Sequence, residues 1–413
     1  MGSDAFLILL GALLVVAFLA EEAFRWQRLP PVLVLMTCGL LLGPVTHALP
    51  VEDFTRVAPH FGALAFLLIL FEGGLDLDLK AVVGGFAPGA RLALYNFVAA
   101  LIVATAIALA SGLPWLSALV LGLVLAPISG AIVLPLSGRL GLRPELRALV
   151  VLEGALADVF GVLGLELVAR WLTGGGLAGL LAIGSLLAAA FSVILALVAG
   201  LLWPRVLRAL GERRYIDVLT FGIALAMWGF VEFLGASGVL VVLCFGLTLA
   251  NEREILAVIG LDPSPVAEMA SDVVTRLHAF IVQLTFLVRA FFFVLLGVVV
   301  QFTALAGRRY LEALAVLGLF AAVRFAVLKV LERRGRIALA PSERRLVWYL
   351  QPRGLVSAVL AIEAVHLGVA GAGAFLAMAS LVIIGSNVVM AVGLRAFPIG
   401  ATMAGIGKQP TRE

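Results

Sequence analysis

Charged residues are scarce in this chain of 413 residues. Only 13% of the residues are Asp, Glu, Lys or Arg, whereas 63% are hydrophobic. Soluble domains are about 25% charged and about 45–50% apolar. The composition therefore predicts an all-α polytopic membrane protein, whose length measures the number of spans rather than the number of soluble domains.

Cysteine and histidine are scarce as well. The two cysteines, Cys38 and Cys244, lie inside apolar segments, so we interpret them as small core residues rather than as a disulfide or a metal site. The four histidines (positions 47, 60, 278 and 366) fall at the ends of predicted helices, which argues against a histidine proton relay. A phosphate-binding loop, a nucleophile triad and a metal-ligand cluster are all missing. We expect neither an enzyme, a cofactor nor a nucleic-acid partner.

Long apolar segments fill most of the sequence. The first segment lacks a basic leader and an obvious cleavage site, so we expect it to be a retained helix. Stretches of about 18 or more apolar residues are candidate spans. Thirteen are predicted, at 5–25, 31–48, 61–77, 89–112, 114–137, 145–172, 177–209, 215–235, 236–251, 277–303, 310–331, 344–367 and 370–396.

Arginine and lysine alternate between the loops. One side holds Arg25, Arg28, Arg139, Arg143, Arg147, Arg205, Arg208, Arg213, Arg214, Arg333, Arg334, Arg336, Arg344 and Arg345. The other side holds Arg56, Arg170, Arg308 and Arg309. Positive residues favour the cytoplasmic side, so the pattern predicts an inner-membrane protein with its N-terminus outside and a short C-terminal tail, 397–413, in the cytoplasm. The net charge of +4 adds little to this.

Two helix breaks lie in corresponding predicted segments. The fifth segment carries Pro127 and Gly130, and the twelfth carries Pro352 and Gly354. Proline removes a backbone donor and glycine lowers the cost of unwinding. Either break alone could be a tolerated kink. Each lies in the middle of a triplet of segments, 89–172 and 310–396, and the two triplets run in opposite senses, which is the inverted-repeat pattern of secondary transporters.

Carboxylates and arginines inside apolar segments point to a buried site. Asp158 lies near the middle of segment 145–172, where an acid usually marks an ion or proton pathway, although a structural hydrogen-bonded acid remains an alternative. Glu153 is five residues earlier and points about 140° away, so we expect a different role for it. Buried arginine needs an acceptor. The favoured partner of Glu153 is Arg324.

Arg289 and Arg353 are the other two intramembrane arginines. Arg353 occupies the second break, and Arg289 lies near the centre of segment 277–303, with Glu72 and Glu232 as candidate partners. Glu166 and Glu363 lie toward helix ends, where we expect them to be solvated.

Four motifs resemble the monovalent cation/proton antiporters of the sodium/proton exchanger superfamily, most closely the NhaP-like branch. They are LFEGGL at 70–75, LEG at 152–154 followed by Asp158, PRGLVSA at 352–358, and the stretch from Pro31 to GLLLGP at 39–44. The resemblance covers essentially the whole chain and is specific in the order and spacing of its motifs. It implies thirteen helices with two crossed broken helices, Asp158 as the ion- and proton-binding residue, Glu153 and Arg324 as a buried structural pair, and Arg353 as the arginine of the second broken helix.

The same resemblance implies a division into bodies. A dimerisation or scaffold domain would comprise 1–88 and 215–305, a core transport domain 89–172 and 306–396, and a linker helix 173–214. The implied protein is a homodimer surrounded by membrane lipid.

Two positions depart from the family pattern. Where the family usually has Thr-Asp-Pro, this chain has Ile128, Ser129 and Gly130, and where it has Asn or Asp before the essential Asp, this chain has Ala157. Asp158 is then the one carboxylate at the usual site positions, with the Ser129 hydroxyl and the Ile128 backbone as further oxygen ligands. Either Na+ or K+ fits this set.

The predicted function is electroneutral exchange of a monovalent cation for a proton at Asp158, by movement of the core. Two alternatives stay open. One is an organic-anion transporter of the same fold with Arg289 or Arg353 as counter-charge, and the other is a transport-inactive membrane sensor of ions or pH.

Overall fold

The computed structural model describes residues 3–27, 29–46, 51–77, 79–173, 178–210, 215–260, 266–300 and 307–395, and within these ranges it is helical with no strand. Helices of the first half are α1 (Ser3–Gln27), α2 (Pro31–Leu40), α3 (Val51–Asp76), α4 (Leu79–Ala110), α5 (Trp115–Leu125), α6 (Gly130–Arg139), α7 (Pro144–Thr173) and α8 (Ala178–Leu210). Those of the second half are α9 (Ile216–Phe233), α10 (Gly238–Ala250), α11 (Glu252–Ile259), α12 (Val266–Val299), α13 (Gly307–Arg333), α14 (Pro341–Tyr349), α15 (Leu355–His366) and α16 (Phe375–Arg395).

Each of the thirteen predicted segments overlaps at least one of these helices. Within the described ranges, nine spans are long and apolar enough to cross a membrane, and shorter apolar helices cover 31–45, 238–250 and 355–366. The chain is therefore a multi-pass membrane protein, while the count of thirteen membrane crossings stays a prediction. The predicted tail, 397–413, lies outside the described residues.

Several helices begin earlier than predicted. The structure starts α3 at Val51, α4 at Leu79 and α12 at Val266, each about ten residues before the apolar run. Hydropathy marks the apolar part of a helix, and a helix can continue beyond it into polar residues. The expected domain boundary at residue 88 consequently falls inside α4, which runs through Pro88.

Helix α11 was not predicted. It is short, with Glu252 and Glu254 in its first turn and Gly260 in the left-handed conformation (φ 77°) just after its end. Acidic residues at the start and glycine after the end are ordinary helix signals. The helix is only eight residues long and follows the apolar segment 236–251, so a search for long apolar segments does not find it.

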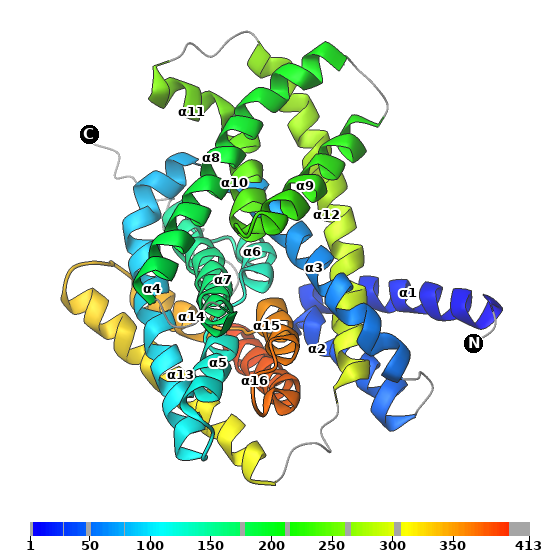
Figure 1. Cartoon of the computed structure of the whole chain (residues 1–413), viewed down its shortest axis with the longest axis vertical. Coiled ribbons are helices and arrows are strands. Elements are labelled where there is room, and N and C mark those ends of the chain that lie inside the picture. The colour runs from blue at the N-terminus through cyan, green and yellow to red at the C-terminus, as the bar shows by residue number, and fades with distance from the viewer. Residues whose placement is uncertain are drawn as a thin grey trace, which may run out of the picture.

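The helices pack in two groups (Figure 1). One group holds α2, α3, α8, α10 and α12, in which α10 packs on α3 and α8, and α12 packs on α2 and α3. The other holds α4, α5, α7, α13 and α16, in which α4 packs on α7, α5 and α13. Helix α15 contacts both α3 and α7, so it lies where the two groups meet. The assignment of these groups as fixed and moving bodies remains a prediction.

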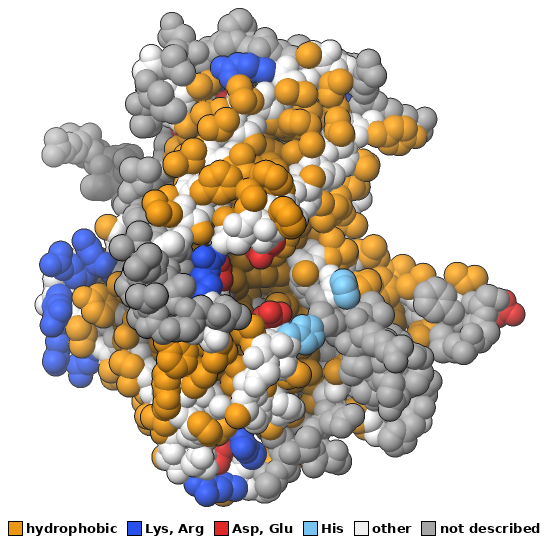
Figure 2. All heavy atoms as spheres, in the orientation of Figure 1, with side chains coloured by type: hydrophobic (Ala, Val, Ile, Leu, Met, Phe, Trp, Pro, Cys, Tyr) orange, Lys and Arg blue, Asp and Glu red, His pale blue; other side chains and the backbone are white. Residues whose placement is uncertain are grey.

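Burial separates interior spans from outer ones. In the span Trp115–Leu134, which includes the first break, 78% of the residues are buried, against 17% in α1 and 22% in α8. Figure 1 shows α1 extending away from the other helices. Figure 2 shows one face of the molecule, mostly hydrophobic, with a few acidic and histidine side chains gathered around a hollow near its middle. The broken helix is thus a core element, and α1 and α8 present their apolar surface outward.

Candidate functional site: the crossing of two broken helices

Both predicted breaks are present, and they touch. Helix α5 ends at Leu125, two residues before Pro127, and the chain resumes as α6 at Gly130. Helix α14 ends at Tyr349, and α15 begins at Leu355 after the break at Pro352. The backbone N–H of Ser129 donates to the carbonyl of Pro352 at 2.8 Å, which ties one break to the other.

Asp158 lies at this crossing, with a side chain that is almost completely buried (2% exposed). Its Oδ2 accepts a hydrogen bond of 3.0 Å from the backbone N–H of Gly130, the first residue of α6. The N-terminus of a helix carries partial positive charge and unpaired N–H groups, so it stabilises a carboxylate. The other oxygen, Oδ1, is buried and has no hydrogen-bond partner within the described part of the chain.

Glycine permits the approach of α6 to Asp158. A Cβ at Gly154 would lie 2.7 Å from the Cα of Gly130, and a Cβ at Gly130 would lie 3.1 Å from Asp158 Oδ2. Side chains at these two positions would hold α6 and α7 apart. The close packing of the two helices is therefore what brings the Gly130 N–H within reach of the carboxylate.

Arg353 caps the end of α5. Its guanidinium donates to the carbonyls of Leu125 (3.2 Å), Gln351 (2.9 Å) and Ala126 (3.4 Å), and it lies over the ring of Phe320 at 4.3 Å. The last carbonyls of a helix have no partner inside the helix, so a buried cation at this end is stabilising. Its Nε, Nη1 and Nη2 atoms are each bonded to a backbone carbonyl, which argues against its acting as the counter-charge for an organic anion.

Glu153 and Arg324 form the bidentate pair expected from the sequence. The two Nη atoms of Arg324 reach the two carboxylate oxygens of Glu153 at 2.5 and 2.9 Å, and both residues are buried. Arg324 also donates to the carbonyls of Val347 (2.8 Å) and Leu350 (3.0 Å) at the end of α14. The pair therefore joins α7 to α13 and satisfies the carbonyls beside the second break.

Two polar residues of α16 complete the second break, and sequence reasoning missed both. Ser386 accepts from the backbone N–H of Arg353 at 2.9 Å, and the amide of Asn387 donates to the carbonyl of Arg353 at 2.8 Å. Both side chains are buried. Adjacent polar residues inside an otherwise apolar helix were the available signal, since the broken backbone needs partners from a neighbouring helix.

The partner of Arg289 differs from both predicted candidates. Its guanidinium contacts Glu21 of α1 at 3.1 Å and the carbonyl of Ala131 at 3.4 Å. Glu232 instead accepts from the backbone N–H of Gly238 at 2.9 Å. Glu72 lies near enough to Arg289 for an electrostatic interaction, but the ion pair that Arg289 forms in the described structure is with Glu21. The prediction failed because hydropathy gives no information on which helices α1 approaches.

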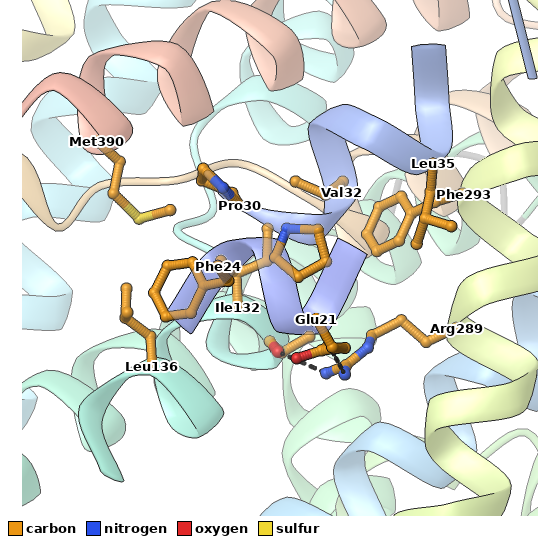
Figure 3. A pocket seen from close by; sticks show the side chains of 12 residues that line it. Glu21, Phe24, Pro30, Val32, Leu35, Ile132, Leu136, Arg289, Phe293 and Met390 are labelled. Atoms are coloured by element: carbon orange, nitrogen blue, oxygen red, sulfur yellow. Dashed lines mark hydrogen bonds and ion pairs between the residues drawn. The ribbon is translucent and has the colours of Figure 1, made fainter. Parts of the chain in front are cut away.

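Glu21 and Arg289 line a cavity of about 50 Å³ between the two groups of helices (Figure 3). The close-up shows the two side chains pointing toward each other, with Phe24, Pro30 and Phe293 around them. The remaining lining is almost entirely apolar. Arg289 is therefore engaged on the protein side, which again disfavours a role as an anion's counter-charge.

The histidines are not all at helix ends. His278 lies within α12 rather than at its end, because α12 begins eleven residues before the predicted segment. Its Nε2 is 2.8 Å from Asp76 Oδ1. His60 is likewise inside α3, since that helix begins at Val51. His366 is the last residue of α15, 3.8 Å from Glu363, and His47 lies outside the described residues. Glu166 is only partly exposed, and it pairs with Arg170.

Crossed, interrupted helices around a buried carboxylate are typical of secondary transporters. The chain belongs to the sodium/hydrogen exchanger family, whose transmembrane profile matches residues 10–398. It is 29% identical over 153 residues to the K(+)/H(+) antiporter NhaP of Alkalimonas amylolytica, a match that covers 36% of this chain and 26% of the relative.

The fold is also that of a solved sodium proton antiporter, MjNhaP1 from Methanocaldococcus jannaschii. Its structure at pH 8 superposes with a TM-score of 0.76 at 18% identity, over 95% of this chain and 100% of the other. A second structure, determined by electron microscopy, gives a TM-score of 0.73 at 19% identity, with all of each chain covered. The predicted fold is confirmed by these matches.

Proposed function

We propose that the chain exchanges a monovalent cation, Na+ or K+, for a proton across the inner membrane, with Asp158 as the shared binding residue. Membership of the sodium/hydrogen exchanger family supports exchange of this class. One of the two relatives is named as a K(+)/H(+) antiporter and the other as a sodium proton antiporter, so a panel of ions must decide the cation.

The observation that carries the proposal is the environment of Asp158. One oxygen is fixed by the start of α6, and the other is buried beside the break without a hydrogen-bond partner in the described structure. A buried carboxylate is costly while it is charged and unpaired. A proton or a cation on the second oxygen would neutralise it, so the loaded site can cross the membrane barrier and the empty charged site cannot.

Three finer features belong to the same proposal. Exchange is one cation for one proton, because a single carboxylate carries one of either. The group of helices around α4, α5, α7, α13 and α16 moves against the group around α3, α10 and α12 to expose the site on alternate sides. The protein is a homodimer embedded in membrane lipid, with its N-terminus outside and its C-terminus in the cytoplasm.

The test is a flux assay in proteoliposomes that contain a pH-sensitive dye. Addition of Na+, K+ or Li+ to the wild-type protein should move protons, and Asp158→Asn should remove the response while leaving thermal unfolding in detergent cooperative. Glu363→Gln, an exposed acid of α15, is the matched control and should exchange normally. Near-normal exchange by Asp158→Asn would overturn the mechanism, and no response of the wild type to any ion would favour the sensor.

A further inference from the structure

Ser129 and Ala157 stand at two positions where the family pattern has a carboxylate or an amide side chain. Asp158 is therefore left without a second acidic or amide side chain at these positions. We propose that Ser357 of α15 supplies a further oxygen to the transported cation, together with Asp158 and Ser129. This inference rests on the proposed function of Asp158, and it assigns to the site a residue from the second broken helix.

Four oxygens near the crossing share one property. Asp158 Oδ1, Ser129 Oγ, Ser357 Oγ and Asn387 Oδ1 are all buried without a hydrogen-bond partner in the described part of the chain. Buried polar atoms nearly always have partners, because desolvation without compensation costs free energy. Other such atoms occur elsewhere, for example in Thr105 of α4, Ser380 of α16 and the carboxylate of Asp217 in α9. Those at the crossing differ because they occur together, on the two broken helices and the helices beside them, around the buried Asp158.

The faces of α15 place Ser357 toward the first break. A Cβ at Gly354 would lie 2.5 Å from Ser129 Oγ, so this side of α15 faces Ser129. A Cβ at Gly161 would lie 2.6 Å from Pro127 and 3.2 Å from Leu360, so the Leu360 side faces Pro127 and α7. Within α15, at about 100° per residue, Ser357 is about 60° from Leu360. Ser357 therefore lies beside the side that faces α7, in the first turn of a helix whose N-cap residue, Gly354, faces Ser129.

The level of Ser357 along α15 matches that of Asp158 along α7. The two helices run in the same sense, because Glu153 of α7 is joined through Arg324 to the Leu350 carbonyl before α15, whereas Gly161, later in α7, meets Leu360, later in α15. Leu360 meets α7 at Gly161. Ser357 is three residues before Leu360, and Asp158 is three residues before Gly161, so both lie about 4.5 Å closer to the crossing.

The Ser357 hydroxyl does not form the hydrogen bond within its own helix that serines usually form. A serine inside a helix usually donates to the carbonyl four residues earlier. That carbonyl belongs to Arg353 and accepts from the Asn387 amide at 2.8 Å, while the Ser357 hydroxyl forms no hydrogen bond to it or to any other described residue. A hydroxyl oxygen is a suitable ligand for an alkali cation, which exchanges its hydration shell for protein oxygens.

The experiment compares Ser357→Ala with wild type in the proteoliposome assay and records the cation concentration that gives the half-maximal proton response. Loss of one ligand should raise that concentration about tenfold, with little change in the maximal rate. A binding readout is measured in parallel. A cation that binds only the folded protein raises its Tm, and Ser357→Ala should need about tenfold more cation for the same rise.

Thr105→Val is the matched control, because it removes another buried hydroxyl without a partner, on α4 against Gly122. It should leave half-saturation unchanged. Ser357→Cys, which keeps the volume but offers a soft sulfur, should behave like Ser357→Ala and serves if the alanine variant unfolds. If wild type exchanges and both variants keep its half-saturation, Ser357 is not a ligand. If wild type moves no protons with any cation, the proposed function fails instead.

Discussion

At the residue scale, a side chain of opposite charge meets three of the four helix ends at the crossing. The carbonyl ends of α5 and α14 receive Arg353 and Arg324, and the start of α6 receives Asp158. Unpaired carbonyls attract cations and unpaired N–H groups attract anions. The start of α15 also lies here, one turn before Ser357. The polarity of each helix end therefore matches the charge of the side chain beside it. Among these three side chains, Asp158 has a carboxylate oxygen, Oδ1, without a partner in the described structure.

The buried pair of Glu153 and Arg324 should show strong energetic coupling. Removing one partner strands a charge, so Glu153→Ala and Arg324→Ala should each cost about 3–5 kcal/mol of stability. The double variant should lose much less than the sum, as measured by unfolding in detergent. The partly exposed pair of Arg344 and Glu332 (3.0 Å) is the control, with expected coupling of about 1 kcal/mol or less. Equal and additive losses in both cycles would contradict the role assigned to the buried pair.

Charged residues were the best-predicted parts of the site. An intramembrane acid or arginine is conspicuous because it is costly, and such a residue needs a partner at its own depth. That reasoning found the contact between Glu153 and Arg324. It failed for Arg289, whose partner Glu21 lies on α1, because the approach of one helix to another depends on packing. It also missed Ser386, Asn387 and Ser357, since a neutral polar residue in a helix is too common to stand out.

At the scale of helices, the contact of α6 with α7 determines where the Gly130 N–H lies. Gly154→Ala should push α6 away from α7, because a Cβ there would lie 2.7 Å from the Cα of Gly130. The expected cost is about 1–3 kcal/mol of stability, with weaker cation binding. Gly138→Ala, at the other end of α6, is the control. Its nearest neighbour would be Arg147 at 3.8 Å, so it should be neutral or slightly stabilising.

A second contact between elements predicts a pH dependence. Arg143 donates to Glu343 at 2.6 and 3.1 Å, and joins the start of α7 to the start of α14. Partial burial raises the pKa of Glu343, but the hydrogen bonds from Arg143 and from the backbone of Ala340 outweigh this and hold the pKa below its ordinary value. A lowered pKa means that the stabilisation is complete above the ordinary carboxylate pKa and is lost as the pH falls through the lowered one.

Glu343→Gln should therefore reduce stability near neutral pH by about 1 kcal/mol or less, because Arg143 is well exposed. The difference from wild type should shrink when thermal unfolding is measured at about pH 3 to 4. Glu145→Gln is a suitable control, since its carboxylate is exposed and 3.8 Å from the same arginine. A deficit that persists unchanged in acid would show that the pair does not titrate as described.

Helix breaks were predictable from proline and glycine, whereas helix ends were less so. Pro127 and Pro352 each lie in a break, where proline removes a backbone donor, although α4 and α8 continue through Pro88 and Pro204. The early starts of α4 and α12 and the existence of α11 were missed. Hydropathy shows where the apolar residues begin. The backbone hydrogen bonds of a helix can start earlier, among polar residues.

At the scale of the whole molecule, the crossing lies among buried helices, and α15 contacts both groups of helices. A site at such a boundary can be opened to one side and then the other by relative movement of the groups. The order of the helices and of the two breaks could be predicted because the apolar segments and the prolines follow one another in the sequence. The contacts between the two groups could not be worked out from the residues, since they depend on side-chain packing between distant segments.

Transport by a single carboxylate should not respond to membrane voltage. With Na+ or Li+ as the transported ion, valinomycin and K+ can set the potential while a fixed pH gradient drives exchange. The steady cation gradient should then be the same at every voltage, because one cation replaces one proton. A gradient that shifts with voltage would require a second proton carrier. Glu72 of α3 is the first residue to test for that role, with Glu72→Gln as the variant.

Proton release on cation binding tests the central claim most directly. Purified protein in detergent and weak buffer is titrated with Na+ or K+ while the pH is recorded, over a series of starting pH values. Competition at one carboxylate predicts up to one proton released per cation bound, with release decreasing as the starting pH rises and Asp158→Asn releasing none. Cation binding without proton release at every pH, or wild-type release by Asp158→Asn, would contradict the assignment of Asp158 as the shared site.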